Sequence, residues 1–385
     1  MKKKVCIIHS FYYPDIIGGA EISTKILSEQ LNNIIEVEVL TVGGSKEKLT
    51  YNEIYQVPVY RLPYNNLYWL KDAGRKNSRE KVLWHIINSY NIVQYERVKE
   101  LLTQNKPEIV HTQNLSGLSV SVWKAASELN IPIVHTLRDY SLLRPVNSRL
   151  FSYFSSSIAK YFSKYVSAVI GISQYILDEH INGGFFKEAN KYVIPNVVEN
   201  KSISKKKVST RDSLKLGYFG QLTSNKGVDS LLKALSTIPE HIVSDLYICG
   251  EGPEENNLKE ISKDNRIKYL GKLPYDKVID IMQQVDLTVV PSTWEEPFGR
   301  VIIESYQAGT PVIASKVGGI PEILIDSSKY SFTPNSPKEI TESIIDYYNY
   351  SYNDKKDIQD VCIKKSEEFN VENMIDKHLN VYEKL

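Results

Sequence analysis

The stretch 286–320 constrains the fold of this chain more than any other part of the sequence. The segments Asp286–Pro291 and Pro311–Ser315 are short, apolar and rich in β-branched residues, so each predicts a buried strand. Between them, Arg300–Ala308 has helical spacing and stops at Gly309. The stretch therefore predicts a strand, a loop, a helix and a second strand parallel to the first.

The loop of this unit, Ser292–Gly299, is a candidate ligand site, because open α/β sheets bind ligands at the carboxyl ends of their strands. It contains the adjacent carboxylates Glu295 and Glu296, and Glu304 follows inside the helix. Carboxylates accept hydrogen bonds from sugar or ribose hydroxyls, whereas the amides at a helix start suit an anion. Glutamates at this spacing are also common on solvated helix faces, so the spacing alone leaves both interpretations open.

The residues around these glutamates favour a ligand site over a solvated helix face. The run Glu-Pro-Phe-Gly-Arg-Val-Ile-Ile-Glu, followed by Ala-Gly-Thr-Pro-Val-Ile-Ala-Ser and Gly-Gly-Ile-Pro-Glu, resembles the E-x7-E signature of retaining glycosyltransferase family 4. The resemblance extends over nearly the whole chain. It implies that Glu296 contacts hydroxyls of the donor sugar and that Glu304 holds the ribose of the nucleotide. It also implies that the amides of Phe298, Gly299 and Arg300 lie near the distal phosphate.

Length and element order predict two α/β domains. A chain of 385 residues with 42% hydrophobic content is too long for one ordinary core and sufficient for two. Strand-like segments alternate with helical ones, which predicts doubly wound parallel sheets. In addition to the two strands above, the predicted strands are Lys4–His9, Glu36–Val42, Glu108–Thr112, Ile131–Thr136, Ala168–Ser173, Tyr192–Pro195, Leu214–Gly220, Asp245–Gly250 and Ile267–Leu270.

The polar, lysine-rich segment Glu199–Asp212 predicts a linker between the domains. The family resemblance implies the GT-B fold, in which two Rossmann-like domains face each other across a cleft. We expect an acceptor-side domain over 1–199, a nucleotide-sugar domain over 200–366, and a helix over 367–385 that crosses back to the first domain. The aromatic and basic segment Tyr51–Tyr90 has no assigned structure and is either an acceptor-side insertion or ordinary packing.

Two glycine loops are further candidates for donor binding. Gly18 and Gly19 follow the first strand and precede a helix, which is a geometry that brings backbone close to a ligand, although a plain tight turn explains them equally well. The resemblance implies that this loop extends toward the acceptor and the donor phosphates. Gly250 ends a strand in a turn of the same kind, and the segment with Leu270 resembles one whose backbone contacts the base. That base is uracil by the family's usual habit.

The segment Gly220–Gly227 resembles the family motif Gly-Arg-Leu-x-x-x-Lys-Gly, whose two basic residues neutralise the donor diphosphate. Lys226 matches the lysine, but Gln221 replaces the arginine. A glutamine gives one neutral hydrogen bond where arginine gives a charged fork, a loss of about 1–2 kcal/mol of phosphate binding. A lysine at a helix start is often merely solvated, so the motif is what indicates a role for Lys226.

Arg138 departs from the family pattern in the first half. The family commonly has Thr-x-His-Asp here, with a histidine that contacts the donor sugar, and this chain has Thr-Leu-Arg-Asp. An arginine cannot act as a base at working pH, so it suits a phosphate or another acidic group instead. His111 and His135 end two predicted strands, where catalytic groups collect, but a structural role is more usual for a lone histidine.

These residues predict a retaining glycosyltransferase that moves a hexose or N-acetylhexosamine from a nucleoside diphosphate sugar, UDP-linked by the family's habit, to a glycan or lipid-linked hydroxyl. We assign catalysis to Glu296, Lys226 and Arg138. The donor is the co-substrate, and we expect no cofactor and no metal, because the sequence has no Asp-x-Asp motif. Two alternatives are a sugar-nucleotide epimerase of the same fold and an inactive, transferase-like binding subunit, which Arg138 and Gln221 would mark.

Composition bears on partners and location. The 47 basic and 46 acidic residues give a net charge of +1, so the overall balance does not indicate nucleic acid binding. The three cysteines have no metal spacing and predict buried free thiols in a reducing compartment. No stretch approaches the roughly 20 apolar residues of a membrane span. We therefore expect a cytoplasmic protein, with a peripheral position at the inner face of the membrane as a further expectation.

That further expectation rests on Arg149–Tyr165, which is strongly amphipathic as a helix. Its aromatic and aliphatic residues fall on one face and its basic residues on the other. The apolar face consists of Phe151, Phe154, Ile158, Phe162 and Tyr165. Either this face packs on the sheet of its domain, leaving a solvated basic face, or the helix meets an anionic membrane.

Overall fold

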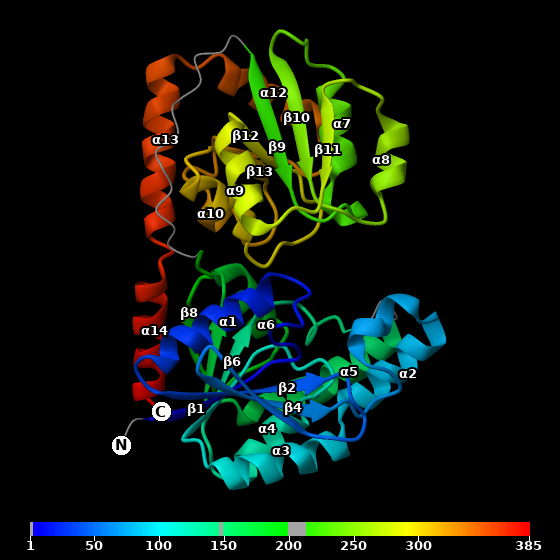
Figure 1. Cartoon of the computed structure of the whole chain (residues 1–385), viewed down its shortest axis with the longest axis vertical. Helices are drawn as coiled ribbons and strands as arrows, with labels where there is room; N and C mark the ends of the chain where they lie inside the picture. Colours follow the sequence, from blue (N-terminus) through cyan, green and yellow to red (C-terminus); the bar gives the residue numbers. More distant parts are fainter. Residues whose placement is uncertain (1–2, 146–148, 199–212) are drawn as a thin grey trace. The chain divides into compact units, whose positions relative to one another are not determined.

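The computed structural model describes residues 3–145, 149–198 and 213–385, with side chains left undescribed for 149 and 150. The chain divides into two compact units, which we describe separately. Unit 1 comprises Met1–Asn196 with Val371–Leu385, and unit 2 comprises Val197–Asn370 (Figure 1). The predicted linker Glu199–Asp212 lies outside the described residues.

Unit 1 is built on an eight-stranded sheet in the order β3-β4-β2-β1-β5-β6-β7-β8. Neighbouring strands are parallel, except that β3 and β4 form an antiparallel hairpin. The strands are β1 Lys4–Ile8, β2 Glu36–Gly43, β3 Thr50–Ile54, β4 Val57–Pro63, β5 Ile109–Thr112, β6 Ile133–Leu137, β7 Ala168–Gly171 and β8 Asn190–Val193. The chain leaves β1 toward β2 first and later returns to the other side at β5, so the strand order reverses between β1 and β5.

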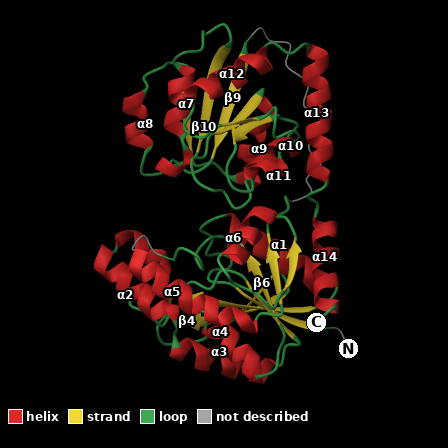
Figure 2. Ribbon diagram, turned by 180° about the vertical axis from the view of Figure 1, so that it is seen from behind, coloured by secondary structure: helices red, strands yellow, loops and turns green. Residues whose placement is uncertain are grey.

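Helices cover both faces of this sheet (Figure 2). They are α1 Gly19–Asn32, α2 Ser78–Ser89, α3 Ile92–Asn105, α4 Ser121–Glu128, α5 Arg149–Phe162, α6 Gln174–Asn182 and α14 Val371–Glu383, with short 3-10 turns at Leu70–Arg75 and Ser163–Tyr165. Side chains at several helix starts accept a backbone hydrogen bond, as Asn77 does from Glu80 at the start of α2. The C-terminal helix α14 packs beside α1 and belongs to unit 1.

Segment Tyr51–Tyr90 contains the hairpin strands, the first 3-10 turn and α2. Trp84 is fully buried and donates from Nε1 to the carbonyl oxygen of Tyr68 at 3.0 Å. The ring of Tyr68 stacks on Trp84 at a centroid distance of 6.0 Å. At least these two aromatic residues of the segment therefore serve in packing.

The orientation of α5 corrects one interpretation. Ala159 and Ser163 are buried on unit 1, whereas Phe151 and Phe154 are exposed. The helix packs on the fold through a side that includes Ala159 and Phe162, whose ring stacks on Tyr90. The prediction that the aromatic face would cover the sheet is therefore wrong for these two residues.

Unit 2 is built on a six-stranded parallel sheet in the order β11-β10-β9-β12-β13-β14. Its strands are β9 Leu214–Phe219, β10 Val243–Cys249, β11 Ile267–Gly271, β12 Leu287–Val290, β13 Val312–Ser315 and β14 Ser331–Phe332. Its helices are α7 Val228–Leu235, α8 Glu255–Ile261, α9 Tyr275–Gln284, α10 Arg300–Gln307, α11 Ile320–Ile323, α12 Pro337–Tyr348 and α13 Tyr352–Glu367, with a 3-10 turn at Ser224–Lys226. Both units are doubly wound, as predicted.

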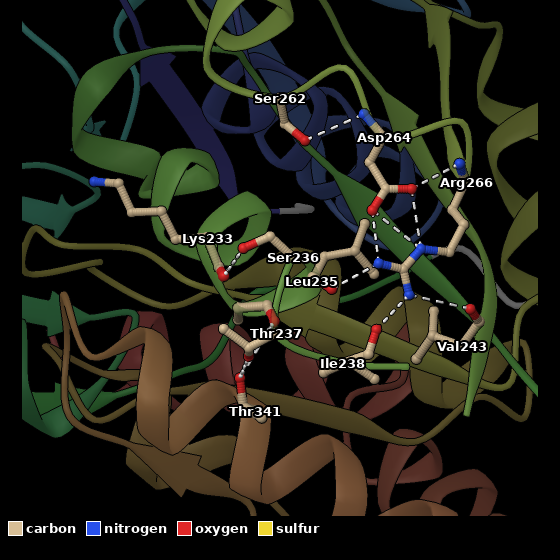
Figure 3. Close-up of polar contacts among 11 residues, drawn as sticks. Lys233, Leu235, Ser236, Thr237, Ile238, Val243, Ser262, Asp264, Arg266 and Thr341 are labelled. Atoms are coloured by element: carbon tan, nitrogen blue, oxygen red, sulfur yellow. Dashed lines mark hydrogen bonds and ion pairs between the residues drawn. The ribbon is translucent and has the colours of Figure 1, made fainter. Parts of the chain in front are cut away.

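A buried arginine fastens one edge of unit 2 (Figure 3). Arg266 is 8% exposed and donates to the carbonyl oxygens of Leu235 and Ile238, both at 2.7 Å. Its charge is balanced by Asp264, whose Oδ2 lies 2.6 Å from Nη2. The guanidinium thereby supplies hydrogen-bond donors to carbonyl groups at the end of α7 and just after it, where the helical ladder stops.

The fold also bears on the predictions for the cysteines and for the C-terminal helix. Cys6, Cys249 and Cys362 are all buried free thiols, as expected. The helix predicted over 367–385 is shorter, because α13 ends at Glu367 and α14 begins only at Val371. Within the described residues, no helix combines the length and apolar character needed to cross a bilayer.

Candidate active site

The strand order of unit 2 reverses between β9 and β12. The chain runs from β9 to β10 and β11 on one side, then returns to β12 on the other side of β9. Open α/β sheets bind ligands at such a switch point, beyond the carboxyl ends of the strands. The two loops that begin there contain Lys226 and Glu296, so the sheet brings together residues that lie 70 positions apart in sequence.

Lys226 and Glu296 form an ion pair in which Nζ lies 2.5 Å from Oε1. Ser292 Oγ donates to the same carboxylate oxygen at 2.7 Å. The Lys226 side chain is 24% exposed and that of Glu296 is 12% exposed, so both charges are largely withdrawn from water. The ring of Trp294 lies near the ammonium group, with its centroid 5.6 Å from Nζ. The site thus combines one cation and one carboxylate acceptor within a few ångströms.

Backbone contacts fix the two loops against each other. Thr293 donates its amide to the carbonyl oxygen of Asn225 at 2.9 Å. Gly227 has φ 67°, and a Cβ there would lie 2.0 Å from the carbonyl oxygen of Pro291. Only glycine allows this approach, so the glycine after Lys226 sets how closely the lysine loop meets the Glu296 loop.

Glu304 is paired within its own helix. Arg300 Nε lies 2.7 Å from Glu304 Oε1, and both side chains are about 15% exposed or less. Burial raises the pKa of Glu304, and the charge and hydrogen bond of Arg300 oppose that rise. Arg300 Nη1 is buried and has no hydrogen-bond partner among the described residues. Gly299, with φ 99°, is the residue directly before α10 and serves as its N-cap.

The other donor-side residues have different surroundings. Phe298 is 3% exposed and meets Phe369 edge to face, so its side chain is part of the core and only its backbone can serve a ligand. Gln221 is exposed. Gly250 approaches the neighbouring loop, since a Cβ there would lie 1.8 Å from the carbonyl oxygen of Gly220. The Leu270 side chain packs against the core.

Unit 1 has a second polar cluster at its own switch point, beyond β1, β5 and β6. Arg138 donates from Nε to Gln113 Oε1 at 2.5 Å and from Nη1 to Asn196 Oδ1 at 2.6 Å. Gln113 is buried and also accepts from Thr24 Oγ1 at 2.6 Å. The guanidinium is therefore held in one orientation by two side-chain oxygens.

The glycine loop of unit 1 is capped internally. Glu21 Oε2 accepts from the amide of Gly18 at 2.7 Å and from that of Ile17 at 3.3 Å. Burial raises the pKa of Glu21, against the lowering effect of these amides. Gly19 is exposed in this loop. In this structure the Gly18 amide thus already has an anionic partner.

His111 and His135 have structural roles. His111 is fully buried, with Nδ1 2.7 Å from Tyr382 Oη of α14 and Nε2 2.8 Å from Thr136 Oγ1. His135 Nδ1 lies 2.9 Å from Thr112 Oγ1, and burial lowers its pKa to about 3. Both imidazoles are neutral and enclosed by packed side chains.

Sequence reasoning missed Ser292, Gln113 and Asn196. Each lies just beyond a strand, at the edge where the two switch points occur. A search for polar residues directly after predicted strands would have found Ser292 and Gln113. No metal-ligand cluster of three or more His, Cys, Asp or Glu occurs among the described residues.

Similarity to known proteins shows the family to which this chain belongs. The family model described as "Glycosyl transferases group 1" matches residues 199–367, and the model described as "Glycosyltransferase Family 4" matches residues 17–201. A protein of Klebsiella pneumoniae, named only as an uncharacterised 42.6 kDa protein in the cps region, is 36% identical over 83% of this chain and 87% of its own length. The chain belongs to the glycosyltransferases.

Other relatives of this glycosyltransferase have named activities or ligands. The GPI3 subunit of phosphatidylinositol N-acetylglucosaminyltransferase from Saccharomyces cerevisiae is 23% identical over 83% of the chain and 69% of its own length. The structure of HepE from Anabaena in complex with UDP-glucose matches 99% of the chain and all of that protein, with a TM-score of 0.71 and 21% identity. The glycosyltransferase therefore has the GT-B fold, with two Rossmann-like domains.

Proposed function

We propose that this glycosyltransferase moves a sugar, with retention of anomeric configuration, from a nucleoside diphosphate sugar to a hydroxyl of a glycan or lipid-linked glycan. The observation that carries the proposal is the 2.5 Å contact between Lys226 and Glu296 at the switch point of unit 2. In a nucleotide sugar, the distal phosphate and the sugar are bonded to each other. One donor can therefore present its phosphate to the ammonium and its sugar hydroxyls to the carboxylate.

Each residue then has a defined task. Lys226 binds the distal phosphate and stabilises the charge that grows on the leaving diphosphate, assisted by the amides at the start of α10. Glu296 accepts hydrogen bonds from sugar hydroxyls, and Ser292 holds its carboxylate in place. Glu304 accepts hydrogen bonds from the ribose hydroxyls, which replace part of its present contact with Arg300. These groups neutralise the diphosphate without a metal ion.

We assign the acceptor to unit 1, where Arg138 presents a fixed positive charge at the sheet edge. An arginine stays protonated, so its task is to bind an anionic group and not to move a proton. We assign no side chain as a covalent nucleophile. Departure of the diphosphate and attack by the acceptor on the same face of the sugar account for retention.

The relatives support the choice of donor and acceptor. HepE was crystallised with UDP-glucose, which supports a UDP-linked sugar as donor. The yeast relative is named for transfer of N-acetylglucosamine to phosphatidylinositol, which supports a lipid-linked acceptor. We propose a cytoplasmic location with peripheral contact to the inner face of the membrane.

The test begins with donors. A thermal-shift series with UDP-, GDP-, ADP- and dTDP-linked sugars should show stabilisation by one class, because a ligand that binds only the folded state raises the unfolding temperature. That donor is then incubated with sugars linked to short alkyl chains, with and without EDTA, and the product's anomeric coupling is read by proton NMR. We expect a product of unchanged anomeric configuration in both conditions.

Three results would contradict the proposal. A product of inverted anomeric configuration would contradict retention. Complete loss of activity in EDTA, restored by magnesium or manganese, would contradict the metal-free mechanism. Turnover of donor without any acceptor, giving an isomeric nucleotide sugar, would indicate an epimerase. Donor binding without turnover with any acceptor would indicate a binding subunit.

A further inference from the structure

The helix α2 exposes an aliphatic face. Leu83 is 52% exposed, and Ile86 and Ile87 are exposed beside it. Their spacing at i, i+3 and i+4 puts them on one side of the helix, while Trp84 on another side is buried in unit 1. Arg79, one turn before Leu83, is exposed on the same side. In most surface helices the aliphatic residues face the core, whereas in α2 these three face outward.

The helix α5 exposes an aromatic and basic face. Tyr153 is 76% exposed and Phe154 is 54% exposed, and Tyr161 is exposed as well. Lys160 is exposed on the side of Tyr153 and Tyr161, and Lys164, in the 3-10 turn that follows the helix, is exposed as well. The Lys164 ammonium lies 3.9 Å from the ring centroid of Tyr161. Tyrosine interleaved with lysine is the composition that proteins place at the boundary between lipid and water.

The two helices form one surface element. They lie side by side at one end of the unit 1 sheet in both views (Figures 1 and 2). Ser89 of α2 and Ser155 of α5 are joined by a hydrogen bond of 2.7 Å between their hydroxyls. Tyr90, directly after α2, stacks on Phe162 of α5 at 5.1 Å. A serine pair and one aromatic stack thus join the helices, while Leu83 and Phe154 remain exposed.

Charge is concentrated in the same place. Residues 78–89 and 149–165 contain five Lys or Arg and one Glu, in a chain whose net charge is +1. The segment 149–165 has no acidic residue at all. A basic surface with exposed apolar side chains is complementary to a bilayer that carries anionic headgroups, because lysines meet the headgroups while apolar side chains enter the boundary below them.

We propose that α2 and α5 together form a docking surface for an anionic lipid bilayer, which we call the α2–α5 surface. The exposed residues that define it are Leu83, Ile86, Ile87, Phe154, Tyr161 and Lys164. Its value for catalysis rests on the proposed function, since docking would hold the enzyme at the bilayer that contains a lipid-linked acceptor. Binding to lipid itself is independent of transfer and can be measured separately.

The surface uses both attraction to charge and apolar insertion. Each basic residue near an anionic bilayer strengthens binding about fivefold, and this contribution is screened by salt. Insertion of the aliphatic and aromatic side chains is not screened. Binding should therefore weaken at high salt without vanishing, and loss of either kind of residue should weaken it.

The test is co-sedimentation of the full chain with phosphatidylcholine vesicles, with and without phosphatidylglycerol, at low and high salt. One double variant removes apolar contacts, Leu83→Ser with Phe154→Ser. A second reverses charge, Lys160→Glu with Lys164→Glu. Matched controls make the same changes on exposed residues of unit 2, Ile261→Ser with Val361→Ser and Lys233→Glu with Lys338→Glu.

We expect wild type and both controls to bind anionic vesicles at low salt, and each α2–α5 variant to bind at least tenfold more weakly. Thermal unfolding confirms that the variants fold, and nucleotide release with a water-soluble acceptor should equal that of wild type. Unchanged solution transfer together with lost vesicle binding separates this surface from the proposed function. No vesicle binding by wild type, or α2–α5 variants that bind as wild type does, would overturn the proposal. Dimers that the Leu83 and Phe154 variant dissociates, without vesicle binding, would assign the face to a second copy instead.

Discussion

Lys226 Nζ lies 2.5 Å from Glu296 Oε1, and the contact joins the loops that follow β9 and β12. It means that the ammonium proposed to bind phosphate and the carboxylate proposed to bind sugar neutralise each other before a donor arrives. A bound phosphate must then compete with Glu296 for the ammonium, while sugar hydroxyls compete with the ammonium for the carboxylate. The two residues should therefore have opposite effects on nucleotide binding and on transfer.

Glu296→Gln separates these effects. The change removes the carboxylate charge but keeps the size of the side chain, so Lys226 is released to the phosphate. We expect the affinity for UDP alone to stay equal or rise, while the transfer rate falls by about a hundredfold because the sugar loses its charged acceptor. Calorimetric titration of UDP and steady-state kinetics measure the two quantities. Transfer at the wild-type rate would remove Glu296 from the site.

Glu304→Gln tests the ribose contact. Alanine is the poorer choice, because it would leave the largely buried Arg300 without its partner and destabilise unit 2. We expect wild type to bind UDP about tenfold or more tightly than its dideoxyribose analogue, and Glu304→Gln to lose most of that preference. The ratio of the two dissociation constants is insensitive to a general loss of folded protein. A ratio equal to that of wild type would contradict the assignment.

Arg138 is predicted to recognise an anionic group. Hydrogen bonds to Gln113 and Asn196 aim the guanidinium, and a neutral imidazole cannot reproduce both its charge and these donors. We expect Arg138→His and Arg138→Ala each to raise the KM for transfer at least tenfold with little change in UDP affinity. Arg144→Ala, at an exposed arginine of the same unit, is the control. Wild-type kinetics in Arg138→Ala would exclude this role.

Acid should destabilise unit 1 before unit 2. Burial lowers the pKa of His9 and His135 to about 3 and of His180 and His378 to about 4, and it lowers that of His111 as well. The unfolded chain binds protons at these histidines below about pH 6.5, whereas the folded chain does not. Each contributes up to about 1.4 kcal/mol of lost stability per pH unit below 6.5, down to its folded pKa.

All five of these histidines belong to unit 1. Hydrogen exchange read by mass spectrometry between pH 7 and pH 5 should therefore show loss of protection in unit 1 first. His111→Phe or His378→Phe would flatten the pH dependence if the variant folds. Equal loss of protection in both units over this range would contradict the explanation.

Much of the fold followed from local sequence patterns, and the exceptions have physical causes. Apolar, β-branched segments predicted the central strands because those strands are buried on both faces. The edge strand β3 gave no such signal, since its residues Thr50–Ile54 are almost all exposed and mostly polar. The two-residue strand β14 is too short for any periodic pattern to reveal.

The sites were predicted less completely than the strands. Motifs indicated that Lys226 and Glu296 serve one donor, but their direct contact depends on how β9 and β12 pair, which no local pattern contains. For α5, helical spacing shows which side is apolar but not which side the rest of the fold covers, and the fold covers the side with Ala159. Phe154 therefore lies outside, contrary to the packing interpretation.

The central claim is that the switch point of unit 2 binds a nucleotide-sugar donor through Lys226. The most direct test is calorimetric titration of UDP and UDP-sugars into the full-length wild type, Lys226→Ala, and the control Lys233→Ala, an exposed lysine on α7. A charged hydrogen bond to phosphate contributes about 1.5–3 kcal/mol, which corresponds to a tenfold to hundredfold change in Kd. We predict saturable binding to wild type and to the control, with Kd raised tenfold to a hundredfold in Lys226→Ala. Absence of binding to wild type across nucleotide classes, or equal Kd values in all three proteins, would contradict the claim.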